Sequence, residues 1–174
     1  MQFGLSKPLQ KFLKIKQLLP ADMSCPFYCW SLHRTKYHGR STLIAMNISN
    51  RYALLFTGLQ SADWEDIDGL VLDGIKQAFL REGYSNEQTG QYLKAAGAVE
   101  FSKLHGDKAL AGLKSIISML KWLDVALVDG QFFQPLLSRE LNSESCYSFD
   151  YDDYGYPSEF LAKDMQRVLQ TDSS

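Results

Sequence analysis

The sequence is poor in the features that mark secreted and membrane-spanning proteins. Three cysteines in 174 residues are an odd and small number, which argues against a disulfide framework and favours a reducing compartment. No apolar run approaches the roughly 18 residues of a membrane span, and residues 1–20 lack the long apolar core of a secretory signal. We therefore expect a cytoplasmic protein with no membrane partner.

Motifs of common enzymes are also missing. The sequence contains no G-x-S-x-G, H-E-x-x-H or C-x-x-C motif and no phosphate-cradling glycine loop. Its histidines, His33, His38 and His105, are paired with no nucleophile. His105 and Asp107 place polar groups at a predicted helix N-terminus, where anions bind, although Asp107 is more simply an N-cap. We predict no catalytic residue and no cofactor, with a small enzyme as an alternative because catalytic groups converge in space.

One segment has side chains that suit zinc. Cys25, Cys29, His33 and His38 follow the spacing C-x3-C-x3-H-x4-H, and thiolates and imidazoles are zinc ligands. The proline and aromatic residues of this segment favour extended chain, in which residues 25–33 span roughly 26 Å at about 3.3 Å per residue. One ion cannot bridge that length, so no metal site is predicted.

Apolar periodicity outlines the fold. Alternation of apolar and polar residues predicts strands, and apolar spacing of three or four predicts helices. The predicted strands cover residues 1–6, 27–37, 41–47, 51–57 and 98–104, and the predicted helices cover residues 7–15, 63–82, 86–97, 107–124, 135–142 and a last stretch from Pro157. We predict one α+β domain over residues 1–142, a mostly antiparallel sheet of about four to five strands with helices packed on one face.

The most patterned stretch is STLIAMNISNRYALLFTGL, residues 41–59. Two apolar runs flank a polar centre. Asn47, Ser49 and Asn50 suit a hairpin loop, because their side chains bond the local backbone and asparagine tolerates left-handed conformations. No turn requires Arg51, so we single it out as a candidate binding residue.

Charge is spread unevenly, although the net charge is only −2. Residues 1–40 hold seven basic residues against one acidic residue, a net charge of +6, and residues 140–174 hold two basic against eight acidic residues, a net charge of −6. Such asymmetry indicates an anion-binding face or two ends that attract each other. Two differently charged solvated surfaces explain it equally well.

The basic residues gather on the predicted strand 27–37 and the turn after it. Basic side chains interleaved with aromatic ones are typical of nucleic-acid-binding sheets, but no RNP-type motif is present, and a charge-protected edge strand explains the same pattern. We expect Arg51 to return beside these residues across the hairpin. The candidate binding surface comprises Trp30, His33, Arg34, Lys36, His38, Arg40 and Arg51.

The C-terminal part, residues 143–174, is an acidic tyrosine-rich segment followed by a helix. An acidic and aromatic segment can dock on a basic surface, within the chain or across a dimer, and the alternative is a partly disordered connector. The candidate docking residues are Tyr151, Asp152, Asp153, Tyr154 and Tyr156.

Several stretches together resemble a family of small bacterial domains of unknown function. They include LSKPLQKFL, STLIAMNISNRYALLFTGL and VEFSKLHGDKALAGLKSII, and the resemblance covers residues 1–142. It implies a cytoplasmic α+β domain of bacterial or phage origin, and it brings no activity, cofactor or substrate. Where members carry a charged n-R-s stretch before the later helix, this chain has Gly106, Asp107 and Lys108, which weakens any transfer of a site to this position.

The sequence thus predicts a non-enzymatic interaction or regulatory domain that binds a protein partner or associates with itself. Nucleic-acid binding through the basic and aromatic strand is the first alternative, and a small enzyme is the second. Salt-dependent affinity would identify nucleic-acid binding, because phosphate contacts release counterions.

Overall fold

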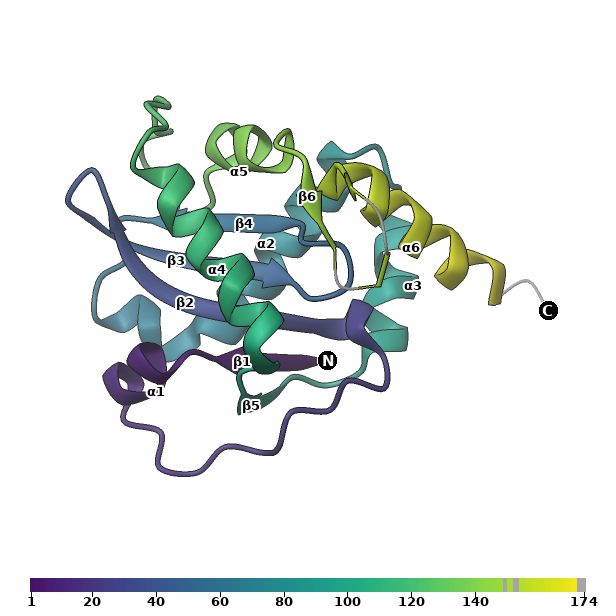
Figure 1. Ribbon diagram of the computed structural model, residues 1–174, viewed down its shortest axis with the longest axis horizontal. Helices are drawn as coiled ribbons and strands as arrows, with labels where there is room; N and C mark the ends of the chain where they lie inside the picture. Colours follow the sequence, from purple (N-terminus) through teal and green to yellow (C-terminus); the bar gives the residue numbers. More distant parts are fainter. Residues whose placement is uncertain (149, 152–153, 172–174) are drawn as a thin grey trace.

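A five-stranded mixed sheet organises the computed structural model, which describes residues 1–148, 150–151 and 154–171 (Figure 1). The strand order is β4-β3-β2-β1-β5. The strands are β1 (Gln2–Leu5), β2 (Cys29–Tyr37), β3 (Arg40–Asn47), β4 (Ala53–Thr57) and β5 (Glu100–Lys103). The strands β2, β3 and β4 form an antiparallel meander, whereas β1 runs parallel to both β2 and β5.

The predicted α+β class and the predicted strands are confirmed, but the sheet is mixed. The parallel pairs arise from long connections. The chain leaves β1 through the helix α1 (Lys7–Leu13) and a loop before it enters β2, and a connection of this length lets two parallel strands pair. The strand β5 reaches β1 only after two further helices.

Helices cover both faces of the sheet, not one face as the sequence led us to expect. The helices α2 (Ile67–Arg81), α3 (Asn86–Ala96) and α6 (Pro157–Thr171) supply residues to one apolar cluster, and α4 (Gly106–Leu120) and α5 (Pro135–Asn142) supply residues to the other. In Figure 1, α4 crosses in front of the strands and α2 lies behind them.

The strand β3 explains this two-sided cover. Leu43 and Ala45 belong to the cluster with α2, and Ile44 and Met46 belong to the cluster with α4. Because successive strand residues point to opposite faces, a continuous apolar run needs cover on both sides.

Helix starts followed their sequence signals in one case and departed from them in another. Ser85 caps α3 with a capping box, in which its side chain accepts from the N–H of Gln88 and the side chain of Gln88 accepts from the N–H of Ser85. Asp107 is not an N-cap, because α4 already begins at Gly106 and His105 holds the cap position without a side-chain hydrogen bond. A left-handed φ of 82° at Gly106 allows this earlier start.

The C-terminal part is integrated into the fold. Two short antiparallel strands, β6 (Cys146–Tyr147) and β7 (Tyr154–Gly155), precede α6. Leu161, Met165 and Val168 of α6 lie in the same apolar cluster as the sheet and α2. None of the helices in the described part of the chain combines the length and apolarity that a bilayer crossing requires.

Candidate functional site

A cavity of about 770 Å³ lies where β1 and β5 end and α1 and α4 begin. Most of its wall is apolar. The apolar lining residues are Leu5, Pro8, Leu104, Leu110, Leu113 and Ile117. Leu5 and Leu113 are buried, and Leu110 is 37% exposed, so the cavity has a closed floor and an apolar rim.

The topology of the sheet creates this cavity. The strand β1 lies between its two parallel neighbours, β2 and β5. The chain continues from β1 to β2 on one side, and it adds β5 on the other side only later in the sequence. Open sheets bind ligands in the crevice at the carboxyl ends of parallel strands where such a switch occurs. Leu5 ends β1 and Lys103 ends β5, and both residues line the cavity.

Ser6 turns the chain from β1 into α1 at the edge of this cavity. Its backbone N–H donates to the carbonyl of Leu32 at 3.0 Å, and its side chain accepts from the N–H of Leu9 at 3.4 Å as the N-cap of α1. Pro8 follows in the first turn, where it costs no helical hydrogen bond. Local sequence therefore places α1 against the end of β1.

The polar side chains of the cavity carry one imidazole, three ammonium groups, one carboxylate, one hydroxyl and one amide. His33 Nδ1 lies 2.9 Å from Oγ of Ser6. Burial lowers the pKa of His33, so the ring is neutral at neutral pH. Lys7, Lys103 and Lys114 also line the cavity, together with Asp107. The arrangement suits binding of a ligand with an apolar body and a polar group.

Trp30 does not lie on a surface. It is 0% exposed, its Nε1–H donates to the hydroxyl of Tyr92 at 3.0 Å, and that hydroxyl donates to the carbonyl of Phe27 at 2.9 Å. The indole therefore belongs to the core, because β2 is the middle strand of the sheet and Trp30 lies in the apolar cluster that includes residues of α2 and α3.

The basic residues of β2 are divided between the two faces of the sheet. Arg34 is half-buried, and its guanidinium carbon lies 4.0 Å from the ring centroid of Phe12. Lys36 lies two residues after Arg34, so its side chain points to the same face of the sheet, and it is exposed. His33 points to the opposite face, which α4 covers. Alternation along a strand thus separates residues that are neighbours in sequence.

His38 and Arg40 lie at the turn between β2 and β3. The ring of His38 stacks on Tyr37 with centroids 4.0 Å apart, and its Nε2 lies 3.9 Å from a carboxylate oxygen of Asp124. Arg40 forms an ion pair with Asp129 at 3.7 Å. Both residues are exposed and contact the loop that follows α4.

Arg51 does not return beside the other basic residues. The turn between β3 and β4 lies at the opposite end of the sheet from His38. Arg51 has a left-handed φ of 65°, and its guanidinium packs where a Cβ on Gly112 would stand. Burial lowers its pKa, and its Nε finds no hydrogen-bond partner among the described residues.

The polar centre of the hairpin is a buried junction as well as a turn. Oδ1 of Asn47 accepts from the N–H groups of Ser49 and Asn50, which is the predicted loop chemistry. Nδ2 of Asn50 donates to Oδ2 of Asp164 at 2.9 Å, and Oγ of Ser49 donates to Asp150 at 3.2 Å. The turn therefore holds the C-terminal part against the sheet.

Among the described candidate docking residues, Tyr151 contacts α6 and Tyr154 contacts its own hairpin. The hydroxyl of Tyr151 donates to Oδ1 of Asp164 at 2.7 Å, and its ring stacks on Phe160. Tyr154 packs edge-on against Tyr147 in the paired strands, and Tyr156 is 45% exposed. Asp152 and Asp153 lie outside the described residues.

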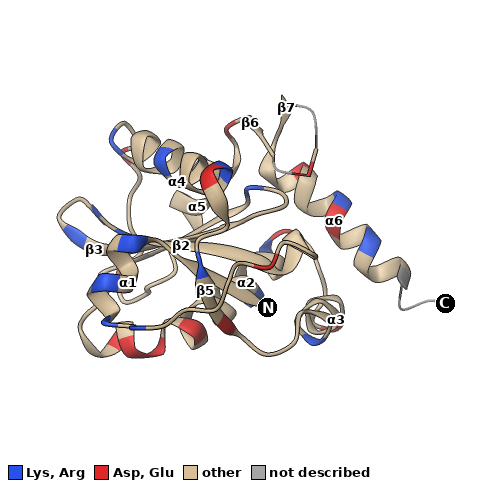
Figure 2. Cartoon of the chain, turned by 60° about the horizontal axis from the view of Figure 1, so that its bottom comes forward, with Lys and Arg blue, Asp and Glu red and all other residues tan. Residues whose placement is uncertain are grey.

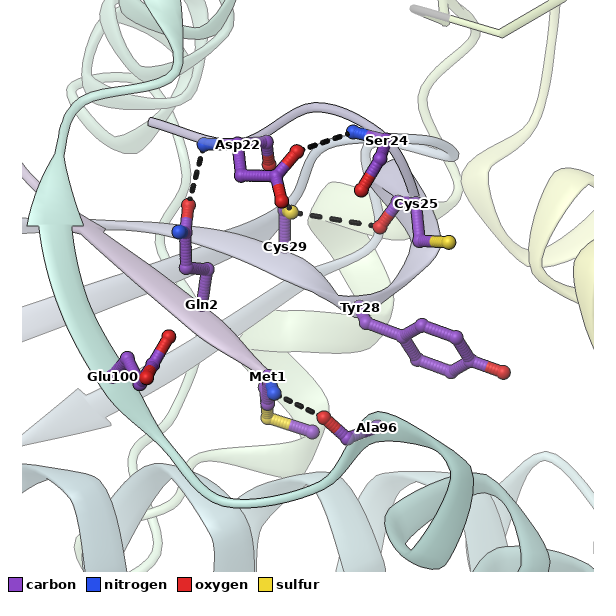
Figure 3. A pocket seen from close by; sticks show the side chains of 9 residues that line it. All are labelled: Met1, Gln2, Asp22, Ser24, Cys25, Tyr28, Cys29, Ala96 and Glu100. Atoms are coloured by element: carbon purple, nitrogen blue, oxygen red, sulfur yellow. Dashed lines mark hydrogen bonds between the residues drawn. The ribbon is translucent and has the colours of Figure 1, made fainter. Parts of the chain in front are cut away.

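The cysteine segment holds no metal cluster in the part of the chain that the structure describes, where no group of three or more His, Cys, Asp or Glu residues gathers. A cavity of about 170 Å³ does lie beside Cys25 and Cys29 (Figure 3). Sγ of Cys29 donates to the carbonyl of Cys25 at 3.5 Å, and burial raises the pKa of Cys29 to about 11. This thiol therefore stays protonated near neutral pH and is a poor nucleophile.

Comparisons with known proteins give one match. The model of the family described as Domain of unknown function (DUF6933) matches residues 2–160. The expected resemblance to an uncharacterised family is confirmed, and the match continues past residue 142 into α6. No curated protein and no solved structure matches the chain.

Proposed function

The chain belongs to the family described as Domain of unknown function (DUF6933), and from that premise we propose that it is a non-enzymatic domain that binds a small molecule between α1 and α4. The observation that carries this proposal is the cavity of about 770 Å³ with its apolar wall. Ligand sites are concave and mostly apolar, hold a few polar groups and measure about 300–1,000 Å³. The position at the ends of parallel strands supports the same reading.

The chemistry around the cavity supports binding without catalysis. Ser6 carries the hydroxyl nearest His33, but the residue is 1% exposed and its oxygen already caps α1. A serine nucleophile has to reach its substrate, and Ser6 is enclosed. We therefore assign Ser6 and His33 to holding the wall of the site.

A regulatory role fits this geometry. A ligand in the cavity would contact α1, α4 and the ends of two strands at once, and a ligand that binds only the folded state stabilises it. Three residues of the predicted binding surface are exposed, namely Lys36, His38 and Arg40. Binding of a protein or a nucleic acid through these residues stays a prediction.

Leu110→Trp tests the proposal, because a larger side chain at the rim fills the entrance. The probe is phenylnaphthylamine, an uncharged dye whose emission rises in apolar surroundings. We expect the unaltered protein to bind it and Leu110→Trp to weaken binding by about tenfold, which is about 1.4 kcal/mol. Leu80→Trp is the matched control, since Leu80 is a similarly exposed leucine of α2 outside the cavity.

The readout is a fluorescence titration, with melting temperatures recorded for all three proteins. Saturable binding that Leu110→Trp weakens and Leu80→Trp leaves unchanged supports the proposal. Absence of saturable binding to the unaltered protein, or equal weakening by both variants, contradicts it.

A further inference from the structure

We propose that the ligand of the cavity between α1 and α4 is an amphipathic anion, with an apolar body and a single carboxylate or phosphate head. This inference rests on the proposed function and adds the chemical class of the ligand. It is carried by the apolar wall, the charges at the rim, the N-terminal end of α4 and the hydrogen bond between His33 and Ser6.

Three lysines from three different elements surround the apolar wall. Lys7 opens α1, Lys103 ends β5 and Lys114 lies in the middle of α4. Asp107 is the single acidic residue in the lining. Figure 2 shows basic residues on α1, β5 and α4. The rim therefore carries an excess of positive charge above an apolar floor.

The ammonium groups of these lysines are available to a ligand. All three are exposed, and none of them forms an ion pair with a described residue. A cleft lined by charge of one sign, with low-dielectric walls, concentrates ligands of the opposite sign. A cationic ligand would be repelled by the same rim, and a neutral apolar ligand would gain nothing from it.

The first turn of α4 adds partial positive charge to this rim. Gly106 and Asp107 line the cavity, and the N–H of Gly106 donates to the carbonyl of Leu104 at 2.8 Å. The N-terminal end of a helix carries partial positive charge, and α4 is 15 residues long. Together with the lysines, this helix end favours an anionic head.

His33 completes the set as a neutral donor. Oγ of Ser6 accepts from the N–H of Leu9, so its own proton is available to Nδ1 of His33 at 2.9 Å. We assign the shared proton to Oγ of Ser6, and the neutral ring then carries its own proton on Nε2, where it can donate. The polar lining is then made of donors, apart from Asp107 and the side-chain amide of Gln10.

A matched pair of dyes tests the sign of the charge. Anilinonaphthalene sulfonate has the aromatic body of phenylnaphthylamine with a sulfonate added. We expect the protein to bind the sulfonate at least about tenfold more tightly than the neutral dye. The difference should shrink as salt is added, because salt screens exposed charges.

Variants identify the groups responsible. Lys103→Gln with Lys114→Gln should bring the affinity for the sulfonate close to that for the neutral dye, because the loss for the sulfonate should exceed the loss for the neutral dye by about tenfold. Lys76→Gln with Lys94→Gln is the control, since it removes the same charge from exposed residues of α2 and α3 outside the lining. Equal losses in the two double variants would overturn the inference.

Competition then distinguishes the head groups. Decanoate or decyl phosphate should displace the sulfonate at concentrations where decanol does not, and the better of the two identifies the head. Melting temperatures should rise with the displacing ligand, because it binds the folded state. Equal binding of both dyes, or equal displacement by decanol, overturns the anionic class alone, whereas failure of both dyes to bind overturns the proposed function itself.

Discussion

At the scale of single residues, His105 is a buried base held between two strands. It is 3% exposed. Its Nε2 lies 3.2 Å from Oε1 of Gln2, and its Nδ1 lies 3.3 Å from Oγ of Ser31. Because an amide oxygen only accepts, the neutral ring donates from Nε2 and accepts from Ser31 at Nδ1. Burial lowers the pKa of His105 from 6.5 to about 4.

This lowered pKa predicts loss of stability in mild acid. The folded state binds a proton less readily than the unfolded state, so the contribution of His105 is complete above pH 6.5 and falls as the pH drops toward about 4. Integrated over that window the loss is roughly 3 kcal/mol. His105→Gln should be less stable at neutral pH but lose less stability between pH 7 and pH 4.5, measured by denaturant unfolding at both values. Parallel losses in the two proteins would exclude His105 as the cause.

At the scale of elements, one glycine of α2 marks where the helix touches the sheet. A Cβ on Gly74 would meet the ring of Phe56 at 2.3 Å, and both residues are buried. Glycine inside a helix is otherwise unfavourable by about 0.5–1 kcal/mol relative to alanine. The close approach of α2 to β4 therefore outweighs helix propensity at this position.

Gly74→Ala should consequently destabilise the protein by about 1–3 kcal/mol, because overpacking forces the ring or the helix to move. Gly90→Ala in α3 is the matched control. Nothing lies within 4 Å of a Cβ on Gly90, so this variant should stabilise the protein by about 0.5–1 kcal/mol. Both values come from chemical denaturation, and a stabilising Gly74→Ala would contradict the packing of α2 on β4.

Elements with strong local signals were predictable. The helix 135–142 was predicted with its observed bounds because Pro135 fixes its start, and the hairpin was predicted because Asn47 and Asn50 bond the local backbone. The faces of the sheet were not predictable in this way. Whether helices cover one face or both depends on which helices pack on the sheet. The apolar run 43–46 predicts a buried strand but does not identify the helices that cover it. In the structure its side chains alternate between the apolar cluster with α2 and the one with α4.

At the scale of the whole molecule, α6 is part of the main core. Met165 is 0% exposed and lies in the cluster that contains the sheet, and Asp164 beside it accepts from Asn50. We predicted a separate domain ending at residue 142, and the packing now leads us to propose one cooperative unit that includes α6.

Met165→Ala should therefore cost about 2–5 kcal/mol of global stability, as for other buried truncations to alanine. Gln166→Ala, one position along on the exposed side of α6, should change stability by less than about 0.5 kcal/mol. Thermal unfolding followed by two probes, far-ultraviolet circular dichroism and tryptophan fluorescence, should give one coincident transition in both variants. Two separated transitions would show that α6 folds apart from the sheet.

The cavity could not be predicted from sequence, because its wall joins residues that are far apart along the chain. Ser6 and Lys7 follow β1, His33 lies in β2, and Lys103 and Lys114 come about a hundred residues after Ser6. A serine N-cap directly after a strand was the one local signal. The parallel pairing of β1 with β5 brings these residues together. The apolar periodicity of each segment predicts a strand, but it does not predict which strands pair.

The position of β1 between β2 and β5 also sets an order of events during synthesis. The strand is made early, yet its second neighbour, β5, begins only at Glu100. At about 5–20 residues per second, the ribosome takes roughly 5–20 s to make the intervening chain. During that interval one side of β1 has no strand to pair with, so the nascent protein carries an open sheet edge until β5 emerges and closes it.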